Sequence, residues 1–213
     1  MPKYKLVLIL VLTIAASVGG AWLARALFRK APPTVPEVAL PSVPAFSLTE
    51  RNGTTVSNEN LKGKVWIASF VFTRCSGTCP QVAATLARLQ SELADVPDLR
   101  LVTFTIDPDR DTPDELKKYA ERFRADPDRW LFLTGSEKEI HALANDGFHV
   151  LAKKRPDGKP GDEFDHSTML VLVDKAGRIR DYYDGMPPLD GPRDQYEASL
   201  KRLLADARAL AKE

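Results

Sequence analysis

The sequence predicts an α/β fold, a sandwich with a central mixed sheet, preceded by an N-terminal transmembrane helix. Apolar strand patterns first alternate with amphipathic helix patterns, and antiparallel strand pairs follow, which is typical of a mixed sheet. The chain also begins with an uncharged stretch long enough to cross a membrane. Its 213 residues fit one domain of roughly 150 residues plus extra segments.

Residues 1–30 are predicted to be a membrane anchor. Residues 6–24 carry no charge, and 19 helical residues span roughly 28 Å, close to the ~30 Å thickness of the hydrocarbon core. A cleaved signal peptide is the competing interpretation, but its apolar part usually runs only about 7–15 residues and ends in a small-residue cleavage site. An anchor with a cytoplasmic N-terminus predicts a single-pass protein of the bacterial inner membrane, with its domain facing the periplasm.

Residues 31–44 are predicted to be a proline-rich linker, because five prolines favour an extended spacer. Residues 45–213 are predicted to form the folded domain. The chain has 30 basic and 29 acidic residues, so its charge gives no argument for a nucleic-acid partner, and none is expected.

The elements of the domain follow from turn residues and hydrophobic periodicity. Asn52-Gly53 between two short β-prone runs predicts a hairpin. Apolar runs predict strands over residues 65–72, 99–106, 130–133, 148–153, 168–174 and 178–184. Capping residues and apolar residues three or four apart predict helices that begin at Pro80, Thr112, Ser136 and Arg193. A polar loop rich in glycine and proline is expected between strands 148–153 and 168–174.

The only two cysteines, Cys75 and Cys79, lie at the turn between strand 65–72 and the helix that begins at Pro80. Open α/β sheets place their sites at the carboxyl ends of strands. The helix dipole, free backbone N–H groups and Arg74 all favour thiolates at this turn. A redox-active pair, a metal site and a structural disulfide remain open, although a disulfide closing so short a loop adds little stability.

A metal site needs more ligands than two sulfurs, and His166 is the best placed of the three histidines. His141 lies near a helix start and His149 in a predicted strand, whereas His166 follows a flexible loop and precedes an apolar strand. Two thiolates and an imidazole suit Cu(I), and the same set could hold Cu(II) with an added oxygen ligand. Structural zinc would require four ligands. Asp165 could orient the imidazole, but a solvated loop acid is the preferred interpretation.

The acid-rich segment 107–113 follows strand 99–106. Paired carboxylates can serve acid–base catalysis or bind a hard metal, but an Asp-Pro turn followed by helix capping explains the pattern better. Asp107 lies at the same predicted sheet edge as the cysteines, so it could support that site.

The chain resembles the SCO/SenC family in three motifs that occur in family order: Cys75-x-x-x-Cys79-Pro80, Asp107-Pro108-x-Arg110-Asp111-Thr112-Pro113 and Asp165-His166-Ser167. Members of this family are membrane-anchored, thioredoxin-like copper proteins that assist cytochrome c oxidase assembly. The resemblance implies that Cys75, Cys79 and His166 bind copper, as Cu(I) or Cu(II). It also implies that the copper centre of oxidase subunit II is the partner, with other periplasmic copper chaperones or thiol reductants.

A membrane-anchored copper metallochaperone, with possible thiol–disulfide reductase activity of the cysteine pair, is therefore the expected function. A thiol–disulfide oxidoreductase or thiol peroxidase on the same fold is the alternative. Three residues separate the cysteines instead of the two in the thioredoxin motif, and His166 would have no purpose in such an enzyme. A periplasmic copper sensor or scaffold is a third possibility.

Overall fold

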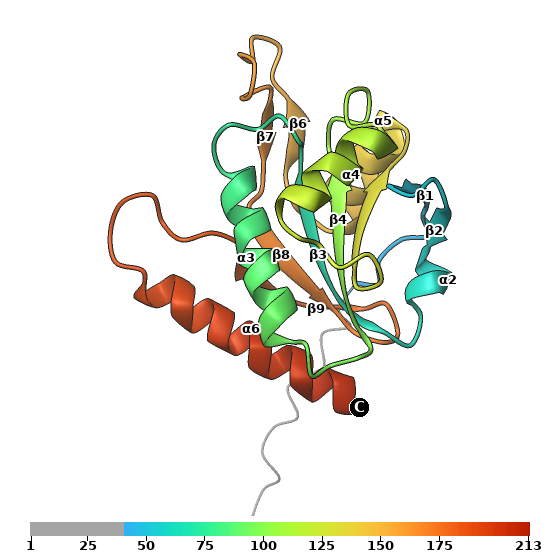
Figure 1. Cartoon of the computed structure of the whole chain (residues 1–213), viewed down its shortest axis with the longest axis vertical. Coiled ribbons are helices and arrows are strands. Elements are labelled where there is room, and N and C mark those ends of the chain that lie inside the picture. The colour runs from blue at the N-terminus through green and yellow to red at the C-terminus, as the bar shows by residue number, and fades with distance from the viewer. Residues whose placement is uncertain (1–40) are drawn as a thin grey trace, which may run out of the picture. The chain divides into compact units, whose positions relative to one another are not determined.

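A computed structural model describes residues 41–213, which contain a seven-stranded mixed sheet (Figure 1). The strands are β1 (Ser47–Glu50), β2 (Thr55–Ser57), β3 (Val65–Val71), β4 (Leu99–Thr105), β5 (Trp130–Thr134), β6 (Ala152–Lys154), β7 (Phe164–His166), β8 (Met169–Val173) and β9 (Ile179–Asp184). The helices are α2 (Asn58–Leu61), α3 (Cys79–Glu92), α4 (Pro113–Arg122), α5 (Glu137–Ala142) and α6 (Asp194–Lys212), and a π-helical turn, η1 (Leu143–Gly147), directly follows α5.

The sheet has the strand order β2-β1-β5-β4-β3-β8-β9. Strands β3, β4 and β5 run parallel to one another, and every other neighbouring pair in this sheet is antiparallel. The predicted mixed sheet is therefore confirmed. So is the hairpin at Asn52-Gly53, which joins β1 to β2.

Strand β3 is buried at all seven positions because both faces of the sheet are covered. On one face, Trp66 and Phe70 of β3 belong to an aromatic cluster with Phe104 and Phe148, and neighbouring ring centroids are 5.0–6.5 Å apart. On the other face, the buried Ser69 hydroxyl bonds to the Thr103 hydroxyl at 2.9 Å. Buried polar groups of the central sheet are thus paired, as low-dielectric surroundings require.

Helices α3 and α6 lie side by side (Figure 1), and the hydroxyls of Thr85 and Tyr196 bond across them at 2.7 Å. Helix α4 begins as its capping residues predict, because the Thr112 hydroxyl accepts a hydrogen bond from the Glu115 N–H. Helix α3 begins at Cys79, one residue before Pro80.

The predicted strand over residues 148–153 is wrong in most of its length. Phe148 follows η1 and packs into the aromatic cluster, His149 has a φ of +51°, and the Val150 N–H bonds to the Ala144 carbonyl at 3.0 Å. Phe148 is buried because it packs on one face of the sheet, and only Ala152 and Lys153 of the predicted strand belong to a ladder. The predicted polar loop contains β7, which pairs with β6 in a separate two-stranded sheet.

The predicted anchor (1–30) and most of the predicted linker (31–44) lie outside the described residues. The last linker residues contact the domain: the Val43 N–H bonds to the Gly177 carbonyl at 2.9 Å and the Ile179 N–H to the Pro41 carbonyl at 3.0 Å. Between residues 41 and 213, no helix combines the length and the hydrophobicity needed to span a membrane.

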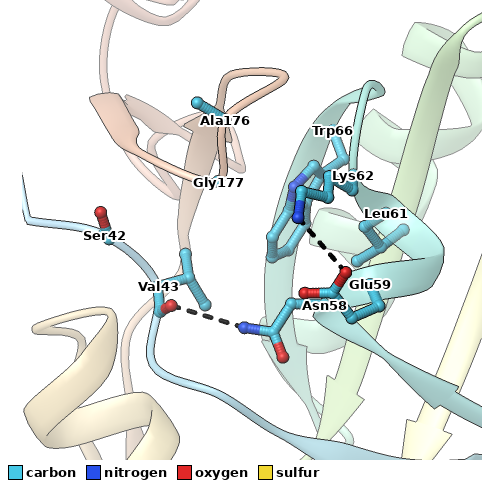
Figure 2. A pocket seen from close by; sticks show the side chains of 9 residues that line it. All are labelled: Ser42, Val43, Asn58, Glu59, Leu61, Lys62, Trp66, Ala176 and Gly177. Atoms are coloured by element: carbon cyan, nitrogen blue, oxygen red, sulfur yellow. Dashed lines mark hydrogen bonds and ion pairs between the residues drawn. The ribbon is translucent and has the colours of Figure 1, made fainter.

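Figure 2 shows a pocket of about 170 Å³ near Trp66, at the amino end of β3. It is lined by Ser42, Val43, Asn58, Glu59, Leu61, Lys62, Trp66, Ala176 and Gly177. The thiols follow the opposite end of β3, so this pocket is separate from the predicted metal site, and its lining offers neither sulfur nor imidazole.

Candidate metal centre

The fold brings the thiol turn and His166 to the same end of the sheet, where β3 ends and β8 begins. The turn follows the carboxyl end of β3, and His166 lies three residues before β8 begins. Because β8 runs antiparallel to β3, its amino end lies beside the carboxyl end of β3. In Figure 1 this end is at the top, where the β6–β7 hairpin stands next to the start of α3.

The structure brings together the three predicted ligand residues. One sulfur from each of Cys75 and Cys79 and one imidazole nitrogen of His166 all lie within 4.8 Å of one another. The Cys79 Sγ and the His166 Nε2 are 3.3 Å apart. In a three-coordinate site, bonds of about 2.0–2.3 Å place the ligand atoms roughly 3.5–4 Å apart. The three side chains therefore fit a single soft metal ion with small adjustments.

The imidazole presents its lone pair to the sulfurs. The His166 Nδ1 lies 3.1 Å from the Ser167 carbonyl, which can only accept, so Nδ1–H is the donor. In the neutral ring Nε2 is then free to bind a metal. Asp165 does not orient this ring, because its carboxylate pairs with Arg155 at 2.9 Å. The preferred interpretation of Asp165 as a surface acid therefore agrees with the structure, where its side chain is 46% exposed, and the Ser167 carbonyl orients the ring in its place.

The other two histidines are not part of this ligand group. The His141 Nε2–H donates to the Ile106 carbonyl at 2.9 Å, and His149 is exposed. Asp107 is buried and pairs with Arg110 at 3.3 Å. Asp107 is thus at the predicted sheet edge but is not one of the three grouped ligand residues.

The two cysteines form no disulfide, and the pKa values of their thiols shift in opposite directions. A hydrogen bond from the Cys79 side chain, together with backbone N–H groups, lowers the pKa of Cys75 to about 3, although burial opposes this. Burial, followed by the hydrogen bond and charge of Cys75, raises the pKa of Cys79. The metal-free pair therefore holds one proton at neutral pH, with the thiolate at Cys75.

The SCO1/SenC family pattern matches residues 37–205. The chain belongs to the SCO1/SenC family. It is 38% identical over 146 residues to the SCO1 protein homolog of Bacillus subtilis (strain 168), covering 68% of this chain and 74% of that protein. BsSco, a member of the Sco family of cytochrome c oxidase assembly proteins, has a similar structure: the TM-score is 0.67 and the identity 33%, over 81% of this chain and 94% of that chain. ScoI of Bradyrhizobium japonicum with copper bound has a TM-score of 0.60 and 28% identity, over 79% of this chain and 99% of that chain. The expected thioredoxin-like fold is confirmed.

In this SCO1/SenC chain, Asp111 stabilises the thiol turn by accepting hydrogen bonds from Thr73, two residues before Cys75. Its fully buried carboxylate accepts hydrogen bonds from the Thr73 N–H at 3.0 Å, from the Thr73 hydroxyl and from the Thr105 hydroxyl. Thr73 lies two residues before Cys75, so Asp111 fixes the start of the turn. The sequence predicts only a turn or capping role for this acid. The threonines at the ends of two neighbouring parallel strands could have indicated that it has buried partners.

Proposed function

We propose that this SCO1/SenC chain is a copper metallochaperone in which Cys75, Cys79 and His166 hold one copper ion. The observation that carries the proposal is the convergence of two sulfurs and an available imidazole nitrogen within 4.8 Å. This donor set suits Cu(I) in particular. Further support comes from the copper-bound relative from Bradyrhizobium japonicum and from the relative in a family of cytochrome c oxidase assembly proteins.

Copper is the cargo of this site. Cys75 provides a thiolate that already exists at neutral pH, Cys79 loses its proton as the ion binds, and the His166 Nε2 lone pair completes the set. The acceptor, for which we propose the copper centre of cytochrome c oxidase subunit II, takes the ion by exchanging ligands. Exchange with a substrate disulfide would oxidise the two thiols to a disulfide and reduce the substrate to two thiols, which removes both sulfur ligands and couples copper capture to the redox state.

The proposal includes the location of the protein. Residues 1–30 would anchor the chain in the bacterial inner membrane, and residues 31–44 would hold the domain away from the bilayer on the periplasmic side. The support is the uncharged stretch over residues 6–24 and the proline-rich composition that follows it. Other periplasmic copper chaperones or thiol reductants would load the site or keep it reduced.

Copper stoichiometry of the reduced full chain, purified in detergent without oxygen, tests the proposal. We expect about one Cu(I) per chain and a loss of affinity of at least about tenfold in His166→Ala, since a three-ligand site loses one ligand. His149→Asn is the matched control, because this exposed histidine lies outside the ligand group and asparagine tolerates its positive φ. Copper binding that His166→Ala leaves unchanged would contradict the assignment of the imidazole.

A thiol–disulfide reductase is the second candidate, and the different pKa values of the two thiols favour it. The Cys75 thiolate would attack a substrate disulfide, and the buried Cys79 would then resolve the mixed disulfide, which releases the reduced substrate and leaves the pair oxidised. Rapid reduction of a model disulfide, or consumption of peroxide, by the metal-free chain would favour this candidate over the chaperone.

A further inference from the structure

The β6–β7 hairpin, which carries His166, is not hydrogen-bonded to the central sheet. An isolated two-stranded hairpin is at best marginally stable in water, so contacts with the rest of the domain must hold it in place. Two hydrogen bonds hold the base of the hairpin: the Asn145 side chain bonds to the N–H of Ala152 at 3.0 Å and to its carbonyl at 2.9 Å. Phe164 packs against Phe72, with 5.2 Å between ring centroids.

A second group of contacts ties the hairpin to the residues on either side of Cys75. Before it, an Arg74 guanidinium nitrogen lies 2.6 Å from a carboxylate oxygen of Glu163. After it, the Ser76 N–H donates to the Gly161 carbonyl at 3.2 Å, and the other Glu163 oxygen accepts from the Gly161 N–H at 2.8 Å. We call the Arg74–Glu163 ion pair and the Ser76–Gly161 hydrogen bond the hairpin latch.

The backbone at Gly161 shows how closely the hairpin passes over the turn. Gly161 has a φ of +90°, and a Cβ atom there would lie 2.8 Å from the Ser76 Oγ and 3.3 Å from the Arg74 carbonyl oxygen. Glycine is therefore the residue that allows this approach.

The latch lies where the turn would otherwise be open. Arg74, Ser76 and Gly77 are exposed, yet Cys75 between them is only 9% exposed. The Glu163 side chain is 12% exposed, so its ion pair is screened less by solvent than a surface pair. The hairpin thus contacts both neighbours of Cys75, whose side chain has little exposure to solvent.

We infer that Arg74 and Glu163 are positioning residues whose ion pair holds the hairpin across Cys75 and His166 beside the sulfurs. Opening the latch exposes Cys75 and separates the imidazole from the thiols, which allows an acceptor ligand to enter. The inference about copper release rests on the proposed function. The inference about the exposure of Cys75 does not.

The first test measures alkylation of Cys75 by iodoacetamide in the reduced, metal-free full chain, located by peptide mass spectrometry. We expect Arg74→Gln and Glu163→Gln each to accelerate alkylation about fivefold, because each breaks the charged hydrogen bond. If the variants acted only through their charge on the thiolate, one would speed alkylation and the other would slow it, since one removes a positive and the other a negative charge near Cys75. Changes in opposite directions would therefore overturn the inference.

The matched control is Arg178→Gln. Arg178 is 48% exposed and pairs with the nearly buried Asp174 at 2.8 Å, whereas Arg74 is 47% exposed. Arg178 lies near the β8–β9 turn, at the opposite edge of the sheet from the thiols. We expect its substitution to leave Cys75 alkylation unchanged. Arg74→Lys keeps a charged donor for Glu163 and should keep alkylation slow, which separates loss of the latch from loss of the fold.

The second test uses the Cu(I)-loaded chain and a competing Cu(I) chelator. Arg74→Gln and Glu163→Gln should release copper about fivefold faster than the unaltered chain and Arg178→Gln. Release rates equal to those of Arg178→Gln would contradict a role of the latch in copper release. If the unaltered chain binds no copper, the proposed function fails, while the alkylation result still decides whether the latch covers Cys75.

Discussion

Asp111 is the residue that most directly links the interior of the domain to the thiols. Its carboxylate holds the Thr73 backbone and hydroxyl, and it also accepts the Thr105 hydroxyl. Burial raises the pKa of Asp111, although these three hydrogen bonds oppose the shift. The thiol turn therefore rests on an acid that ionises less readily in the folded chain than in the unfolded chain.

This raised pKa gives a pH-dependent prediction for Asp111→Asn. A raised folded pKa means that the folded chain binds the proton more tightly than the unfolded chain, so the stabilising contribution exists at low pH and is lost as pH rises through the folded value. Asparagine does not titrate. As pH rises above about 4, the ordinary pKa of an aspartate, the free energy of unfolding should shift progressively in favour of Asp111→Asn until the pH passes the raised folded pKa.

Urea unfolding of the reduced chain at several pH values measures this shift. Asp111→Ala is the comparison, because it leaves the Thr73 N–H and both hydroxyls without their acceptor and should cost about 2–4 kcal/mol at every pH. In Asp111→Asn the amide can donate to the Thr73 hydroxyl, so the fold is kept. A difference between the wild type and Asp111→Asn that grows in favour of the wild type as pH rises would contradict the argument.

At the scale of elements, the sequence predicts some segments well and others poorly. Strand β3 and the start of α4 follow from local signals: an unbroken apolar run and a capping threonine before proline. The segment after α5 does not, because Phe148 and Val150 are buried by packing on the sheet. Strand β7 is missed because a polar sequence can form a strand when ion pairs support it, here Arg155 with Asp162 and Asp165.

Helix α4 provides a prediction about an unsatisfied group. Tyr119 packs against Phe132 and Phe123, and within residues 41–213 its buried hydroxyl has no hydrogen-bond partner. Tyr119→Phe removes that hydroxyl and keeps the ring, so the free energy of unfolding should rise by about 1 kcal/mol. Tyr196→Phe is the matched control, because it breaks the bond to the Thr85 hydroxyl and should lower the stability by about 1 kcal/mol. Urea unfolding of both variants measures the difference, and a destabilised Tyr119→Phe would contradict the prediction.

At the scale of the whole molecule, the sheet topology assembles the site. Cys79 and His166 are 87 residues apart in sequence, and the antiparallel placement of β8 beside β3 brings them within contact distance. The thiol turn could be predicted from the cysteine spacing and the strand before it, and the placement of His166 beside the thiols from its position before an apolar strand and from the family motif. The contacts of Asp111 and the hairpin latch could not, because they depend on which strands become neighbours.

Deletion of residues 1–30 tests whether the described part of the chain is an independent domain. Its core is closed by its own residues, from Val43 at the start to Leu210 in α6. We therefore expect a soluble chain that unfolds cooperatively in urea and binds copper with the same stoichiometry as the full chain in detergent. An aggregated or unfolded product would mean that the deleted segment contributes to the domain core.

The position of His166 late in the chain has a consequence for biosynthesis. A ribosome completes the two thiols and the helix that follows them well before it adds the imidazole, which arrives with the last quarter of the polypeptide. Until β8 docks beside β3, the two sulfurs lack the neighbouring imidazole, which is 87 residues from Cys79 in sequence. If the proposed copper site is correct, only the finished chain can complete it, because a chain that ends before residue 166 has the two sulfurs without the imidazole.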